Sequence, residues 1–256
     1  FFCSWLILIS IASPDLKAEQ ISQFQTNQSL TQRQFLKSFG SLKKNDLLLI
    51  GLEPYLGRNG KNFQLKSAGK NLILKDAQGI IHKSSQINIG WRKIPLESPK
   101  KIVRNVAGPF PSFESAQQFA LKLKNKGISS TVAHPMDWEV WVSPNIQIPN
   151  NLNMVEKTQI IRHETRPFVV SNNLDLLLLG PISIEAPEGL LWEKGLYKGP
   201  FLLKADAYGS WTFIEKVSFP QYLKGVVPHE IGGSSPNIAL AVQAVLARTW
   251  ALANLH

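Results

Sequence analysis

Cysteine is nearly absent from this sequence, and its scarcity excludes two kinds of structure. The 256-residue chain has one cysteine, Cys3, close to its first residue. A single cysteine cannot form an intramolecular disulfide, and it cannot supply the several thiolates of a cysteine-based metal site. With 44% apolar and 18% charged residues, the chain instead has the composition of an ordinary globular protein.

Long hydrophobic runs are also scarce. The first twelve residues are mostly apolar, but twelve residues are too few to span a bilayer, and Ser13-Pro14 ends the run. Followed by Leu16-Lys17-Ala18, this pattern predicts a partial signal peptide over residues 1–18, cleaved after Ala18. An uncleaved N-terminal anchor is the alternative. Both place the chain outside the cytoplasm, as a secreted, periplasmic or cell-wall-associated protein without a further transmembrane segment.

Acidic residues are few in the first half of the chain. Residues 1–126 carry a net charge of +12, whereas residues 127–256 carry −2. A basic half favours an anionic partner, which outside the cytoplasm means peptidoglycan, a teichoic-type polymer or a membrane surface. A solvated face that keeps the protein soluble is the alternative. Aromatic residues do not alternate with the basic ones, so we expect no nucleic-acid partner.

The segments after the signal region predict an α+β fold that is rich in strands. Residues 19–45 are polar and are expected to form a linker. Short apolar runs separated by Gly, Asn and Asp then predict a β-rich module over residues 46–100. A second β-rich stretch follows the Pro- and Asn-rich residues 143–153, and its turns suggest a meander that leads toward the C-terminal region.

Residues 101–143 predict a strand, a helix and further strands. In the helix, Ala116, Phe119, Ala120 and Leu123 form one apolar face, Ser112 is the expected N-cap, and a glycine ends the helix. Together with a Gly-Pro-Phe step before the helix and a Trp-x-Val ending, this stretch is similar to SPOR domains. The resemblance implies binding to peptidoglycan glycan strands; an ordinary αβ packing unit is the alternative reading. Trp138 and Trp141 fit sugar stacking or a core position.

The last residues predict the region where chemistry is expected. A strand-like run over residues 219–227 leads to Pro228-His229-Glu230, and a Gly-Gly-Ser-Ser turn precedes a helix from Asn237 to Leu255. Ser235 is the expected N-cap of this helix, and Pro236 its first residue. The helix is apolar on every face, which predicts a buried helix rather than a membrane span, because Gln243 and Arg248 interrupt it. We expect both to face polar groups, with Glu230 the first candidate.

This C-terminal region resembles the SpoIID/LytB family, whose pattern is roughly YLxGVVPxEM followed by ALKAQAVAARTY. The matching residues are Tyr222-Leu223-x-Gly225-Val226-Val227-Pro228-x-Glu230 and Ala239-Leu240-Ala241-x-Gln243-Ala244-Val245-x-Ala247-Arg248-Thr249. The chain departs from the pattern mainly by apolar substitutions, such as Ile231 for Met and Trp250 for Tyr. The family domain continues beyond this helix, so we expect residues 144–256 to be the N-terminal part of such a domain.

The resemblance implies a lytic transglycosylase that cleaves peptidoglycan glycan strands. In that reading Glu230 and Arg248 are catalytic, and Tyr222, Gln243 and His229 bind substrate. Glycoside hydrolysis usually requires two carboxylates, whereas transglycosylation requires one acid/base, because the sugar's own hydroxyl is the nucleophile. No cofactor is expected and no metal, since no second histidine follows His163 at a ligand spacing. The alternative is a non-catalytic, LytB-like enhancer of a cell-wall amidase that binds glycan only.

Overall fold

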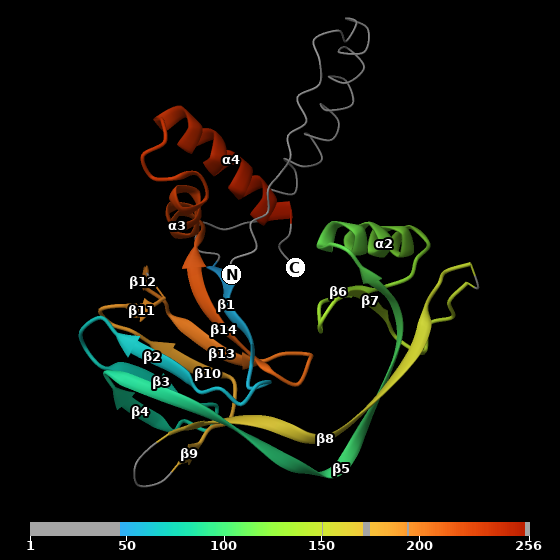
Figure 1. Ribbon diagram of the computed structural model, residues 1–256, viewed down its shortest axis with the longest axis horizontal. Helices are drawn as coiled ribbons and strands as arrows, with labels where there is room; N and C mark the ends of the chain where they lie inside the picture. The colour runs from blue at the N-terminus through green and yellow to red at the C-terminus, as the bar shows by residue number, and fades with distance from the viewer. Residues whose placement is uncertain (1–46, 150, 171–174, 194, 254–256) are drawn as a thin grey trace, which may run out of the picture. The chain divides into compact units, whose positions relative to one another are not determined.

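The computed structural model describes residues 47–149, 151–170, 175–193 and 195–253 (Figure 1). The predicted signal peptide and the linker over residues 19–45 therefore lie outside the described residues. The described chain forms two compact units, one of residues 48–217 and one that begins at Ser218. Strands and helices are both present, which confirms the α+β class. None of the described helices is long and apolar enough to cross a membrane.

The unit of residues 48–217 contains two antiparallel sheets. The first sheet has the order β1-β14-β13-β10-β3-β4, and the second has the order β12-β11-β2-β5-β7-β6, with β8 on the other side of β5 and β9 beyond it. The strands are β1 (Leu47–Leu56), β2 (Phe63–Ser67), β3 (Leu72–Lys75), β4 (Ile81–Ser84), β5 (Gln86–Phe110), β6 (Thr131–Ala133), β7 (Trp138–Val142), β8 (Val155–Val169), β9 (Leu176–Leu177), β10 (Ile182–Glu185), β11 (Leu190–Trp192), β12 (Gly195–Tyr197), β13 (Phe201–Ala205) and β14 (Trp211–Ser218).

The two β-rich stretches predicted as separate modules share both sheets and one hydrophobic core. β3 pairs with β10, and β2 pairs with β11, so strands from residues 46–100 lie beside strands from residues 176–217 in both sheets. Their inward side chains alternate with outward ones along each strand, as in a sheet with one buried face. Phe213 is fully buried at the centre, with its ring 5.3 Å from that of Phe201 and 5.1 Å from that of Phe63.

A second, smaller core lies where helix α2 (Phe113–Asn125) covers β5, β6 and β7 (Figure 1). The predicted N-cap is confirmed, since the Ser112 side chain accepts a hydrogen bond from the backbone N–H of Ser115. At the other end, Gly127 has a φ of 75°, and the N–H groups of Gly127 and Ile128 bond to the carbonyls of Lys124 and Leu123. This double bond pattern is a Schellman motif, which satisfies the last carbonyls of the helix.

The long strands β5 and β8 connect these two cores. They pair along most of their length, with a register shift between Pro95 and Lys100. Much of β8 is exposed and polar, so it lacks the alternation of apolar residues by which a strand is recognised in a sequence. The triplet Arg162-His163-Glu164 lies on this strand, where Arg162 and His163 are exposed, in agreement with the surface position expected for it.

Candidate functional site

The residues predicted as a strand before Glu230 form a helix. Helix α3 runs from Phe219 to Ile231, with a proline in its first turn and Pro228 near its end. The apolar residues of the segment recur at intervals of three and four positions, which is the spacing of one helix face. The helical period therefore prevails over the strand preference of the adjacent valines, and Val227 is the buried residue of this face.

The turn after α3 satisfies the end of one helix and begins the next. Gly232 has a φ of 85°, a conformation that favours glycine, and the Ser235 hydroxyl donates a hydrogen bond of 2.6 Å to the carbonyl of Ile231. Helix α4 (Asn237–Ala253) begins with the Pro236 carbonyl, which accepts bonds from the N–H groups of Ala239 and Leu240. The prediction that Ser235 caps the second helix is thus wrong: its hydroxyl serves the carbonyl end of α3.

Glu230 and Gln243 are brought together by the packing of α3 against α4. The Gln243 side-chain amide donates a hydrogen bond to Oε2 of Glu230, which lies exposed in the last turn of α3. Tyr222, two turns earlier and half-buried, is influenced by the same carboxylate. Burial raises the pKa of the Tyr222 hydroxyl above its ordinary value, and the negative charge of Glu230 raises it further.

Arg248 does not join this cluster, so the expected pairing with Glu230 is corrected. Its side chain is exposed and makes no ion pair or hydrogen bond within the described part of the chain. Positions five apart on a helix differ by about 7.5 Å along the axis and by about 140° around it. Gln243 and Arg248 therefore cannot both face the same carboxylate. His229, the remaining predicted substrate-binding residue, is exposed beside Glu230 on α3.

The prediction that the C-terminal helix is buried is also wrong for the residues described. Its buried side chains are small, Ala247 and Ala251, whereas Ile238 is 77% exposed and Trp250 is 58% exposed. A helix that is apolar on every face needs neighbours on every side to be buried. Helix α3 covers only part of this surface, and apolar side chains of the remainder stay exposed.

The two acids that precede Glu230 in the sequence have structural tasks. Glu215 is buried, and one of its oxygens accepts hydrogen bonds from the backbone N–H groups of Lys198 and Gly199. Asp206 accepts bonds from the N–H groups of Tyr208 and Ser210 and from the Ser210 hydroxyl, which closes the turn between β13 and β14. Both carboxylates are therefore occupied within the first unit.

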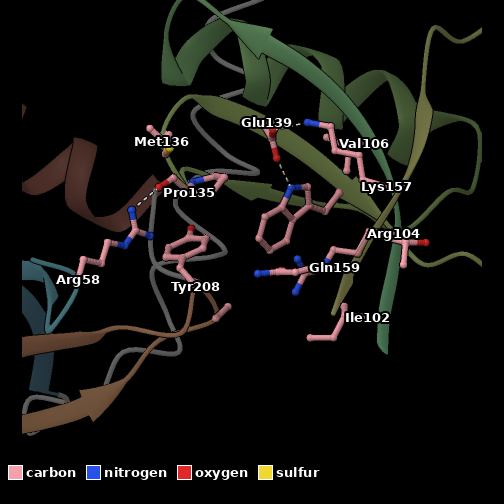
Figure 2. Close-up of a pocket in the computed structure, with 13 residues that line it drawn as sticks. Arg58, Ile102, Arg104, Val106, Pro135, Met136, Glu139, Lys157, Gln159 and Tyr208 are labelled. Atoms are coloured by element: carbon pink, nitrogen blue, oxygen red, sulfur yellow. Dashed lines mark hydrogen bonds and ion pairs between the residues drawn. The ribbon is translucent and has the colours of Figure 1, made fainter. Parts of the chain in front are cut away.

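A groove that the sequence did not predict lies within residues 48–217. A cavity of about 370 Å³ is lined by side chains from β5, β7, β8 and three loops, including Arg58, Arg104 and Tyr208 (Figure 2). A second cavity of about 480 Å³ adjoins it, since Gln159 and Tyr208 line both. The residues that line the groove are far apart in the sequence. Several of them belong to β8, which is polar and has no apolar pattern from which its pairing with β5 could be predicted.

Residues 207–256 match the family model SpoIID, described as "Stage II sporulation protein". The predicted resemblance to the SpoIID/LytB family is confirmed over these 50 residues, which include Glu230, Gln243 and Arg248. The match suggests a function related to sporulation or the cell wall, compatible with a location outside the cytoplasm. No curated protein and no solved structure matches the chain. The SPOR-like similarity of residues 101–143 stays a prediction.

Proposed function

We propose that this chain cleaves the glycan strands of peptidoglycan as a lytic transglycosylase, with Glu230 as the general acid and base. The observation that carries the proposal is the Glu230–Gln243 pair within the segment that matches the SpoIID family. Glu230 is the single carboxylic residue between Ser218 and His256. Transglycosylation needs a single acid/base group, which the carboxyl group of Glu230 supplies in this proposal.

The proposed step needs no water. The 6-hydroxyl of a muramic acid residue attacks the anomeric carbon of the same sugar, and the bond from that carbon to the glycosidic oxygen breaks. Protonated Glu230 gives its proton to the departing oxygen and takes up the proton of the attacking hydroxyl. The products are a shortened strand with a free hydroxyl and a strand that ends in a 1,6-anhydro sugar, so atoms and charge balance.

The neighbouring side chains have positioning tasks in this proposal. The Gln243 amide fixes one oxygen of Glu230, which leaves the other oxygen to exchange the proton. Tyr222 and His229 are proposed to bind the substrate from the same helix. Arg248 stays a predicted catalytic residue, although among the described residues it makes no ion pair or hydrogen bond with Glu230.

The test is mass analysis of purified glycan strands after digestion. The wild-type protein is expected to release 1,6-anhydromuramic products, and Glu230→Gln is expected to release none. Glu156→Gln, which changes an exposed carboxylate on β8, is the matched control and should leave the products unchanged. Circular dichroism of each variant confirms that it is folded. Cleavage by the Glu230→Gln variant at the wild-type rate would disprove the proposal.

A second function is favoured by the surface of the second unit. Glu230 is exposed, whereas the acid of a glycosidase usually lies in apolar surroundings, and α4 presents uncovered apolar side chains that suit a protein partner. The alternative is thus a non-catalytic protein that binds glycan and enhances a cell-wall amidase. Faster release of peptides by an added amidase, with intact glycan chains, would establish this function in place of the first.

A further inference from the structure

The groove in the unit of residues 48–217 has an aromatic floor with an arginine at each end. The rings of Trp141 and Tyr208 meet edge to face with centroids 5.7 Å apart. The Arg104 guanidinium lies 4.0 Å from the centre of the Trp141 ring, and that of Arg58 lies 5.7 Å from the centre of the Tyr208 ring. Aromatic faces of this kind provide flat apolar surfaces with a polar edge.

Both guanidinium groups are held in place before any ligand arrives. Arg58 donates hydrogen bonds to the carbonyl of Pro135, at 2.5 Å, and to the hydroxyl of Ser210, at 3.3 Å. Arg104 is half-buried and stacked on Trp141 (Figure 2 shows Arg58 and Arg104 on opposite sides of the cavity). Neither arginine forms an ion pair with a carboxylate within the described residues. Planar guanidinium groups that are held in place and have no carboxylate partner are suited to bind a carboxylate.

The one carboxylate that lines the first cavity, among the residues described, is already neutralised. Glu139 accepts a hydrogen bond of 2.6 Å from the indole N–H of Trp141, and its other oxygen lies 2.8 Å from Nζ of Lys157. The two arginines therefore leave the cavity with an excess of positive charge. The adjoining cavity adds Lys93, Arg162 and His163 and, in the described part of the chain, no carboxylate.

We propose that this groove binds an acidic saccharide, with the sugar rings against Trp141 and Tyr208 and carboxylates at its two ends, one at Arg104 and one at Arg58. A neutral sugar would leave the two guanidinium groups unpaired, and a compact anion would leave the aromatic surface unused. The two adjoining cavities accommodate more than one sugar residue. The proposal rests on the proposed function only in its choice of probe. Peptidoglycan is the substrate of that function, and its muramic acid carries a lactyl carboxylate that N-acetylglucosamine lacks.

Isothermal titration calorimetry tests this site with the full chain carrying Glu230→Gln, so that the probe stays intact. The probe is a tetrasaccharide of alternating N-acetylglucosamine and N-acetylmuramic acid with free carboxylates, and chitotetraose is the neutral comparator. Arg104→Gln is expected to weaken binding of the acidic tetrasaccharide roughly tenfold or more, because hydrogen bonds between charged groups are lost. Arg104→Lys keeps the charge but not the planar guanidinium group. Its affinity for the acidic tetrasaccharide is expected to lie between that of the parent chain and that of Arg104→Gln.

Lys101→Gln provides the matched control on the same strand. Ile102, Arg104 and Val106 line the groove, so the alternation of β5 directs Lys101 to the opposite face. The control should bind like the parent, and circular dichroism verifies the fold of each variant. Equal affinity for the acidic tetrasaccharide and chitotetraose, or equal effects of Arg104→Gln and Lys101→Gln, would overturn the assignment.

A third ligand separates carboxylate from phosphate recognition. Tripolyphosphate that binds more tightly than the tetrasaccharide, and loses this binding in Arg104→Gln, would assign the groove to a phosphate polymer and overturn the saccharide assignment. The outcome is independent of catalysis. Binding without cleavage by the wild-type chain would contradict only the transglycosylase, and cleavage without binding at the groove would contradict only the groove.

Discussion

The side-chain amide of Gln243 on α4 donates a hydrogen bond to the carboxylate of Glu230 at the end of α3. This bond joins the two helices close to the short turn that connects them. It also gives Glu230 one fixed oxygen, although the residue is exposed. The chemistry proposed for the carboxylate therefore depends on a neighbour thirteen residues further along the chain.

Replacing Gln243 with leucine should reduce glycan cleavage while the fold is retained. The substitution keeps a similar side-chain size and removes the donor, and a hydrogen bond to a charged group contributes on the order of 1.5–3 kcal/mol. We expect the initial rate of anhydro-product formation to fall roughly tenfold. Gln221→Leu, an exposed change on α3, is the control. An unchanged rate in Gln243→Leu would show that Glu230 acts without this bond.

Ionisation of the Tyr222 hydroxyl should lower the stability of the protein in alkaline solution. Burial and the Glu230 carboxylate raise its pKa above the ordinary value of 10.0, so the folded state holds the phenolic proton more tightly than the unfolded state. The resulting stabilisation is complete below pH 10 and is lost as the pH rises through the raised pKa. Tyr222→Phe should remove this part of the alkaline loss of stability, measured by urea unfolding at several pH values.

Glu230→Gln provides the second half of that test. Removing the negative charge should lower the pKa of Tyr222 toward its ordinary value, because the Coulombic contribution disappears while burial remains. The difference in phenolate absorbance between wild type and Glu230→Gln reports this shift, with Tyr222→Phe as the reference. The same titration curve in wild type and Glu230→Gln would mean that the carboxylate does not influence the hydroxyl.

Phe213 should be among the most costly residues to truncate in the larger unit. Its fully buried ring contacts the rings of Phe63, Trp192 and Phe201. Phe213→Ala should lower the free energy of unfolding by about 3–5 kcal/mol, because the lost burial is accompanied by a cavity. Leu121→Ala, at a half-exposed position on α2, should change it by less than about 1 kcal/mol. Chemical denaturation followed by tryptophan fluorescence measures both.

Local sequence patterns predicted the elements in which each side chain is plainly either buried or exposed. The strands of the central core alternate strictly, which marked their stretches as β-rich, and α2 carries its cap, apolar face and terminal glycine within the sequence, which placed both of its ends. The run before Glu230 was misread because adjacent valines favour a strand, while its spacing of three and four fits a helix. The pairing of β8 with β5 was also missed, because β8 is too polar to be recognised as a strand in the sequence. The groove was missed with it, because β8 supplies several of the residues that line it.

The candidate site was predicted in its residue types and in one of its two expected contacts, because Gln243 meets Glu230 and Arg248 does not. A sequence motif placed Glu230 and Gln243 in the same region, whereas the choice between Gln243 and Arg248 as the partner followed from helix geometry. Two residues five positions apart occupy different sides of α4, and only the packing of α3 decides which side faces the carboxylate. The arginines of the groove come from separate strands and loops, and no local pattern connects them.

Two glycines, Gly225 in the middle of α3 and Gly232 just after its end, should respond to alanine in opposite directions. Gly225 lies inside the helix, and among the described residues no side chain or other element lies within 4 Å of an added Cβ, so Gly225→Ala should stabilise the helix by about 1 kcal/mol through reduced backbone entropy. Gly232 ends the helix with a φ of 85° and a ψ of 133°, a sparsely populated conformation that costs an alanine about 1–3 kcal/mol. Thermal unfolding followed by circular dichroism at 222 nm measures both. If Gly225→Ala lowers the stability, α3 does not continue through residue 225 as an unstrained helix.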